Sequence, residues 1–289
     1  MQTPLRIIGL LICALCLAAC GSATRLAYGQ ADDLLYWWMD GYVNFNGDQS
    51  PRVREDITAL LQWHRSTQLP QYAALLARLQ GMAGQDIKTD QACAVADELR
   101  TKFNAVTVQA EAPASTLAMV LTSEQIDHMQ RKFEKNNEAF DREWRKRTPE
   151  ERRARRIKQA RERSEMLYGK LEAAQMLALT ATVDESKFDL EASHTERLRR
   201  QQDMLQTLRK INLEKPAQAQ TAALLRALME RNLSSPNLTY RNRAEGLWRE
   251  TCTSFARVHN STSAAQRSKA VEVLKGYEAD FRVLAGKKG

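Results

Sequence analysis

Apolar residues recur at helical spacing along most of the chain. In the stretches 72–79, 126–144 and 271–284 the large apolar side chains mostly follow one another at intervals of three, four or seven positions, which places them on one side of a helix. Alternation with a period of two is confined to short pieces such as 106–108. Strong helix formers fill the positions between. The pattern predicts an all-α multi-helix bundle of about seven to nine helices.

Several helix starts carry N-terminal capping signals. In a capping box, a Ser or Thr accepts a hydrogen bond from the backbone N–H three residues later, and a Gln or Glu at that position reaches back to the cap. Some segments fit this pattern fully and others in part; they begin at Asn46, Thr122, Thr148, Glu172 and Ser263. Two interpretations stay open: ordinary capping of each helix, or a divergent repeat of helical units.

The N-terminus resembles a bacterial lipoprotein signal. Arg6 precedes an apolar run at 7–17, which is about half as long as a membrane-spanning helix requires. The next residues, Leu-Ala-Ala-Cys at 17–20, resemble the lipobox, in which the Cys receives a thioether-linked diacylglycerol and cleavage occurs just before it. The resemblance implies a signal peptide at 1–19, a lipidated Cys20, a tether at 20–29 and an all-helical periplasmic domain at 30–286. An ordinary secretory signal is the alternative.

The lipobox also implies a location. Several acyl chains hold a protein on a bilayer without a spanning helix, because each buried CH₂ contributes about 0.8 kcal/mol. Gly21 occupies the position at which Asp, in lipoproteins of this class, favours the inner membrane. We therefore expect a lipid-anchored protein of the bacterial outer membrane that faces the periplasm, a compartment that excludes nucleic acid as a partner.

Two cysteines remain for a disulfide. Cys13 and Cys16 leave with the signal peptide and Cys20 is acylated, so the mature chain keeps Cys93 and Cys252 as thiols. Because the periplasm is oxidising, we expect these two to form a long-range disulfide. The alternative is a pair of buried thiols that pack as small apolar residues.

The positive charge is concentrated in one segment. From Trp144 to Arg163 there are ten Lys or Arg and three Asp or Glu, a net charge of +7, which equals the excess that remains once Arg6 is removed from the total of +8. A long, solvated basic helix is expected here. It either binds an anionic partner (lipid headgroups, a cell-wall polymer or an acidic protein) or has no specific partner. The residues expected to bind an anionic partner are Arg145, Lys146, Arg147, Arg152, Arg153, Arg155 and Arg156.

Two aromatic clusters stand out. The first follows the lipidation site and includes Tyr36, Trp37, Trp38 and Tyr42, which form either a core helix or an interfacial belt; three nearby Asp residues favour the core.

The second aromatic cluster joins two amphipathic stretches. Pro70 is expected to open a helix there, and the aromatic residues are expected to pack across the corner of a helical hairpin. Alternatively, this second cluster binds a ligand. Its residues are Trp63, His64, Arg65, Pro70 and Tyr72.

Common catalytic and metal-binding patterns are missing from the sequence. It has no Gly-x-Ser-x-Gly elbow, no P-loop and no zinc-type Cys/His pairing. Glu191 and His194 have the spacing found in di-metal bundles, but such a site needs a second unit of this kind. We therefore expect no enzymatic activity, no metal and no cofactor.

Together, several segments resemble a family of proteobacterial lipoproteins of unknown function. They are the lipobox, 34–38 with Tyr42, Gln49, 63–65, 69–72, Gly169, Leu171, Gln175 and 266–267. The resemblance implies a lipoprotein and adds no activity. Leu-Thr-Ser-Glu-Gln at 121–125 is also similar to the Leu-Thr-x-x-Gln motif of periplasmic chaperones, which are smaller, basic, all-helical client binders.

These observations favour a protein that works by binding. The first expectation is a lipid-anchored periplasmic binding or scaffold protein of the bacterial envelope. The alternative is a chaperone-like binder of unfolded or acidic client proteins, which a test of aggregation of an unfolded protein would distinguish.

Overall fold

The computed structural model describes residues 20–286, and the predicted signal peptide at 1–19 lies outside them. Within this range the chain is all-α, as predicted, and has no β-strand. The helices, labelled α2 to α14, are more numerous than the seven to nine predicted. The reason is that short helices such as α7 (Glu111–Val120) and α10 (Ala173–Asp184) meet their neighbours at corners that the apolar periodicity does not reveal.

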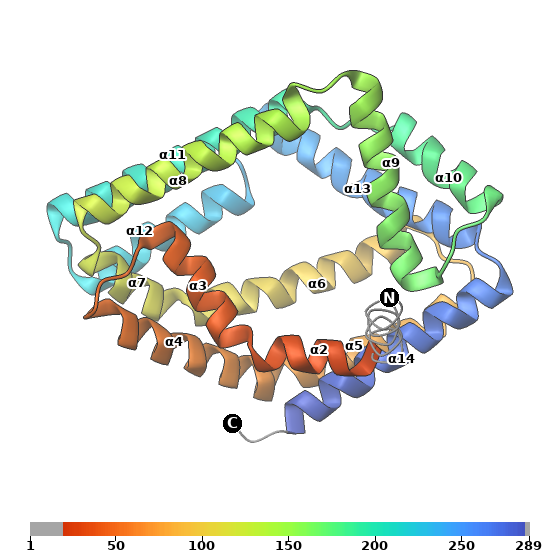
Figure 1. The fold of residues 1–289 in the computed structure, drawn as a ribbon, viewed down its shortest axis with the longest axis horizontal. Helices are drawn as coiled ribbons and strands as arrows, with labels where there is room; N and C mark the ends of the chain where they lie inside the picture. Colours follow the sequence, from red (N-terminus) through yellow and green to blue (C-terminus); the bar gives the residue numbers. More distant parts are fainter. Residues whose placement is uncertain (1–19, 287–289) are drawn as a thin grey trace, which may run out of the picture.

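The helices follow the outline of a four-sided frame (Figure 1) rather than a bundle around one axis. One side consists of α8 (Ser123–Phe140) and α11 (Leu190–Glu214), and the opposite side of α5 (Leu69–Ala83) and α14 (Ala264–Gly286). The other two sides contain α4 (Gln49–Trp63) and α13 (Leu238–Asn260). The remaining long helices are α6 (Thr89–Gln109), which packs on α13, α9 (Pro149–Tyr168), which packs on α10, and α12 (Gln218–Leu233), which packs on α7.

The segment predicted as a tether is helical. It forms α2 (Cys20–Gly29), which packs against α14 and leads into α3 (Ala31–Val43). Arg25 of α2 pairs with the buried Asp280 of α14, with 2.9 Å between Nε and Oδ1. The start of the described chain is therefore held against the body of the protein.

The predicted helical hairpin around Pro70 is wrong. The chain continues from α4 into α5 through a π-helical turn, η1 (His64–Gln68), and a second turn of this kind, η2 (Asp141–Arg145), follows α8. Pro70 stands in the first turn of α5, where a missing N–H costs no helical hydrogen bond. Because η1 supplies a bend without a break, α4 and α5 extend along the frame and do not fold back on each other.

The capping boxes predicted from the sequence are present; the box at Thr148 stands alone, and the other four meet in pairs. Gln125 accepts from the N–H of its own cap Thr122, and Gln49 does the same for Asn46. The two buried Gln amides then bind each other, with 2.6 Å from Gln125 Nε2 to Gln49 Oε1 and 3.1 Å in the reverse direction. Each Nε2 also donates to the backbone carbonyl five residues before the other Gln, that of Asn44 or Val120. This arrangement joins the starts of α4 and α8.

A second pair repeats this geometry at the starts of α10 and α14. Gln175 and Gln266 accept from the N–H groups of their caps, Glu172 and Ser263. Their Nε2 groups donate to the carbonyls of Ser261 and Lys170, each again five residues before the partner Gln. The Gln266 Nε2 lies 3.4 Å from Gln175 Oε1. This recurrence favours the interpretation of a divergent helical repeat over independent caps.

The interior is divided among four separate apolar clusters. The largest lies between α3, α7, α8 and α11 and contains Ile126 and Ile211, both fully buried. A second, around Leu179 and Ala270, joins α9, α10, α13 and α14. Smaller clusters lie between α6 and α13 and between α3 and α4. The frame therefore relies on local packing at each junction together with the paired Gln amides.

The structure joins Cys93 of α6 to Cys252 of α13 by a disulfide, with 5.2 Å between the Cα atoms. Both lie in the apolar cluster between these two helices. The two half-cystines are 159 positions apart in sequence, so the bond closes most of the described chain into a loop.

The paired Gln amides predict the effect of Gln125→Met. The change keeps the volume of the side chain but removes the reach-back cap and leaves Asn44 O and the Gln49 amide without their partner. We expect unfolding in urea to require about 3 kcal/mol less. Gln91 is a matched control, because it caps Lys88 in an exposed box without any partner Gln. Gln91→Met should cost at most about 1 kcal/mol, and equal losses for the two variants would contradict the account.

The disulfide predicts a redox-dependent stability. In the chain-entropy model a loop of this length stabilises by at most about 5 kcal/mol. Reduction with dithiothreitol should therefore lower the urea midpoint of the wild type and leave that of a Cys93→Ser, Cys252→Ser double variant unchanged. Peptide mapping without reduction should recover the linked pair, and two free thiols would refute it.

Candidate functional site

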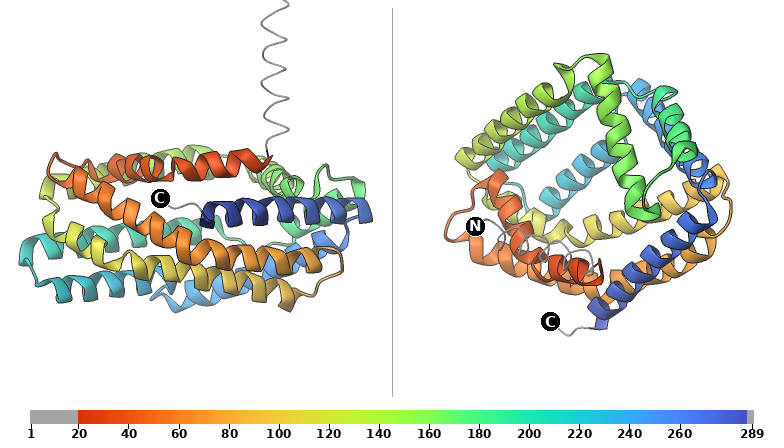
Figure 2. Two further views of the ribbon diagram at one scale, coloured as in Figure 1. Left: turned by 90° about the horizontal axis from the view of Figure 1, so that it is seen from below. Right: turned by 45° about the vertical axis from the view of Figure 1, so that its right-hand side comes forward.

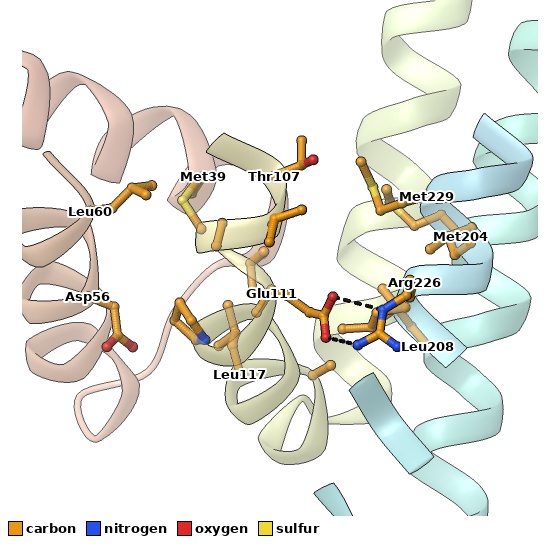
Figure 3. A pocket seen from close by; sticks show the side chains of 18 of the residues that line it. Met39, Asp56, Leu60, Thr107, Glu111, Leu117, Met204, Leu208, Arg226 and Met229 are labelled. Carbon is orange, nitrogen blue, oxygen red and sulfur yellow. Dashed lines mark hydrogen bonds and ion pairs between the residues drawn. The ribbon is translucent and has the colours of Figure 1, made fainter. Parts of the chain in front are cut away.

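The described part of the chain contains a cavity of about 660 Å³ around α7, which we call the α7 cavity. Its walls come from α3, α4, α6, α7, α8, α11 and α12 (Figure 3). The volume falls within the range of small-molecule sites, which is about 300–1,000 Å³. It is partly open to the solvent.

The lining is predominantly apolar, and thioethers contribute much of it. Met39 of α3 and Leu60 of α4 lie on one wall, and the opposite wall presents Met204 of α11 and Met229 of α12 (Figure 3). Leu35 of α3 and Ile57 of α4 also line the cavity and belong to one apolar cluster. Met129 of α8 completes a set of four methionines. Because a Met side chain is flexible and polarisable, such a wall adapts to ligands of different shape.

Small residues on α7 keep the space open. Ala110, just before α7, and Ala114 and Ala118 of α7 line the cavity at intervals of four, so that three positions of its wall carry only a methyl group. Pro113 lies in the first turn of α7, where it is tolerated. Larger side chains at these positions would fill the space that the surrounding helices leave empty.

A few polar groups mark the edge of the cavity. Arg226 of α12 and Glu111 of α7 form a two-point ion pair, with 3.1 Å between Nε and Oε2 (Figure 3). Hydrogen bonds from the Arg226 guanidinium hold the pKa of the Glu111 carboxyl below its ordinary value. Asp56 and Glu230 add two more carboxylates, so the ionisable lining is acidic overall.

One buried acceptor in the lining has no partner. The Oδ1 atom of Asn104, on α6, is buried and accepts no hydrogen bond. Such an atom costs free energy unless a donor reaches it. A ligand with a hydroxyl or amide N–H can supply that donor.

The basic segment forms the expected solvated helix from Pro149 onward, after the Thr148 cap. It covers the end of η2, a bend at 146–148 and α9. Carboxylates from outside the segment pair with four of its basic residues: Glu191 binds Arg145, Asp184 binds Arg153, Glu143 binds Arg155, and Glu165 lies 3.9 Å from Arg161. Arg147 has a weaker contact with Glu151, at 3.9 Å. Among the described residues, Lys146, Arg152, Arg156 and Arg163 have no carboxylate within 4.0 Å.

The Trp63–Tyr72 segment forms a packing cluster between helices. His64 Nδ1 lies 2.9 Å from the hydroxyl of Tyr28 on α2, and its ring also contacts Tyr72. Tyr72 in turn contacts Phe281 of α14, and the Arg65 guanidinium lies over the Tyr28 ring. Burial lowers the pKa of His64 and raises that of Tyr28. The residues named in the prediction lie outside the α7 cavity.

The comparison with protein families decides the classification. A model described as a family of unknown function, DUF6279, matches residues 41–241. The chain belongs to DUF6279. The family match covers every residue that lines the α7 cavity except Leu35 and Met39. Searches of curated proteins and of solved structures gave no match. In the part of the chain that the structure describes, no helix is both long enough and apolar enough to cross a membrane.

Sequence reasoning did not find the α7 cavity of this DUF6279 member. Its lining comes from seven helices, and in the sequence each of its apolar residues is indistinguishable from an ordinary core position of an amphipathic helix. The spacing of Ala110, Ala114 and Ala118 next to Glu111 was the only local signal, since small residues on one side of a helix permit either close packing or a void.

The Glu111–Arg226 pair predicts a pH dependence at the edge of the cavity. A carboxyl whose pKa is lowered in the folded state adds stability above its unfolded pKa, and this contribution is lost as the pH falls through the folded pKa. In Arg226→Gln, the Glu111 pKa should rise toward its ordinary value, because the hydrogen bonds that lower it are gone; carbon NMR of the labelled carboxyl follows this change. Arg209→Gln, which removes an exposed partner of Asp127, is the control and should leave Glu111 unchanged. An unchanged Glu111 pKa in Arg226→Gln would contradict the pairing.

Proposed function

We propose that this protein is a lipid-anchored binding protein of the bacterial envelope, without catalytic activity, that holds a slender apolar chain in the α7 cavity. The observation that supports this most strongly is the cavity itself, which is partly open to the solvent and has an apolar lining. The lipobox at 17–20 supports the anchor, the outer-membrane location and the periplasmic orientation.

The size and lining of the cavity favour an aliphatic ligand. Each methylene transferred from water into such a lining contributes about 0.8 kcal/mol. A chain of about eight buried methylenes therefore gains about 6 kcal/mol before the cost of association is subtracted.

The polar groups restrict the other end of the ligand. Asp56, Glu111 and Glu230 repel an anion, and the one Arg in the lining is already paired with Glu111. A free fatty-acid carboxylate therefore has no partner here. A neutral or cationic head with a hydroxyl or N–H donor complements both the carboxylates and the unpaired Asn104 Oδ1.

A chaperone-like binder is the second candidate. The four methionines of the lining favour it, because flexible thioethers accept apolar side chains of varied shape. In this case the ligand is an apolar segment of an unfolded or acidic client, and the protein should slow the aggregation of an unfolded test protein. A cavity that binds aliphatic alcohols without affecting aggregation favours the first candidate.

The decisive experiment places a large side chain in the cavity at a position outside the buried core. Ala114 lines the cavity and is exposed, whereas Ala112, on the same helix, is exposed but does not line it. Displacement of the neutral dye N-phenyl-1-naphthylamine by dodecanol measures binding. Ala114→Trp should weaken both ligands at least about tenfold, because the indole occupies the space of several methylenes. Ala112→Trp should bind like the wild type.

Two results of the binding assay would contradict the proposed site. If the wild type binds neither the dye nor dodecanol, or if Ala114→Trp binds both as well as Ala112→Trp, the cavity is not the binding site. The anchor is tested separately, by mass spectrometry of the mature N-terminus, which should begin at an acylated Cys20. A mature chain that retains residues 1–19 without fatty acid would contradict anchoring.

A further inference from the structure

The aromatic residues that follow Cys20 divide between the interior and the surface. Tyr36 is buried and donates to Ser50 Oγ, whereas Trp37 and Trp38 are 61% and 63% exposed. Leu34 is exposed as well, so α3 carries an outward apolar stripe at positions 34, 37 and 38. Leu26 of α2 extends the exposed apolar surface. The expectation of a core helix therefore holds for only one side of α3.

The acidic residues that favoured the core interpretation are largely compensated. Asp33 pairs with Arg54 of α4, with 2.8 Å between Oδ1 and Nη1. Asp40 Oδ1 accepts from the backbone N–H of Phe45 at the end of α3. Asp32 is the remaining exposed carboxylate of this helix, and it lies one turn or more from the two tryptophans. The outward stripe is thus bordered by little uncompensated negative charge.

The basic helix lies on the same side of the molecule. In the left view of Figure 2, α2, α3 and α9 lie along one broad side of the frame, with α6, α11 and α13 toward the other. In the segment from Trp144 to Arg163, four basic residues have no described carboxylate within 4.0 Å: Lys146, Arg152, Arg156 and Arg163. One broad side therefore combines exposed indoles with residual positive charge.

We propose that this broad side docks on an anionic phospholipid surface, with Trp37 and Trp38 at the depth of the headgroups. Indole rings favour this depth, because one end is apolar and the N–H reaches polar groups. Basic residues nearby are attracted to the negative surface potential. The docking goes beyond the proposed anchor, since a chain held only by its acyl groups would leave this side in water.

Docking would also place the α7 cavity close to the bilayer. The opposite side of α3 lines the cavity with Leu35, Met39 and Val43, so one helix separates the outward stripe from the binding space. An apolar chain that leaves the membrane beside Trp37 and Trp38 has α3 as its first contact. This part of the inference rests on the proposed function of the cavity.

The test uses the full acylated protein, purified from membranes and reconstituted into vesicles of phosphatidylcholine, with or without phosphatidylglycerol. Quenching of tryptophan fluorescence by brominated phospholipids reports indoles in the interface. We expect quenching in the anionic vesicles and its loss in Trp37→Phe, Trp38→Phe, which retains Trp63, Trp144 and Trp248. Unquenched Trp37 and Trp38 in a protein shown to be acylated would overturn the docking and leave the anchor intact.

Attraction between the basic segment and the anionic vesicle is tested with two pairs of charge-removing variants. Lys146→Gln with Arg163→Gln removes two unpaired charges from the basic segment, and each should lower the ratio of docked to undocked protein about fivefold. Lys210→Gln with Lys215→Gln, at the end of α11, removes the same charge from the other broad side and should have little effect.

Two further results would also overturn the proposal. Equal effects of the two pairs of variants would contradict electrostatic docking through the basic segment. A dimer that forms in solution and is abolished by Trp37→Ser, Trp38→Ser would assign the stripe to a second copy. Dye binding to the α7 cavity is measured without vesicles, so its loss in Ala114→Trp tests the proposed function independently of docking.

Discussion

The architecture depends on two pairs of buried Gln amides, each of which fixes the starts of two helices against each other. Gln49 with Gln125, and Gln175 with Gln266, each link the first turns of two helices that are remote in sequence. Every one of these side chains uses its carbonyl for its own cap and its NH₂ group for the partner's backbone. A buried amide that loses its partner costs about 1–3 kcal/mol, so each corner forms as a unit. The geometry of the frame follows from fixing two such corners.

Fixed corners let the helices enclose space without a single continuous core. Four apolar clusters suffice because each has only to hold a local junction, and the disulfide between α6 and α13 adds a long-range link. Between these junctions, the small residues of α7 leave the α7 cavity unfilled. In a compact bundle, the same apolar surface would be buried against neighbouring helices. The open architecture and the proposed binding function therefore have one physical origin.

Local chemistry could be predicted from the sequence, and long-range partners could not. Helical periodicity predicted the all-α class, and the spacing of Thr122 to Gln125 and of Ser263 to Gln266 predicted caps that are present. Nothing in the sequence indicated that each capping Gln would meet another capping Gln 76 or 91 residues away and donate to the backbone beside it. The hairpin expected at Pro70 failed because a π-helical turn, which has no clear sequence signature, absorbs the change of direction. The charge of the basic segment was read correctly, but its partners Asp184 and Glu191 come from other helices.

Amide hydrogen exchange of the intact protein tests the central claim most directly. The first N–H groups of a helix normally exchange fast, because they have no helical acceptor. The N–H groups of Asn46, Thr122, Glu172 and Ser263 should instead exchange slowly and with one common free energy within each corner, whereas the capped but exposed N–H of Lys88 should exchange fast. Exchange of all five at the same fast rate would contradict the account of paired corners.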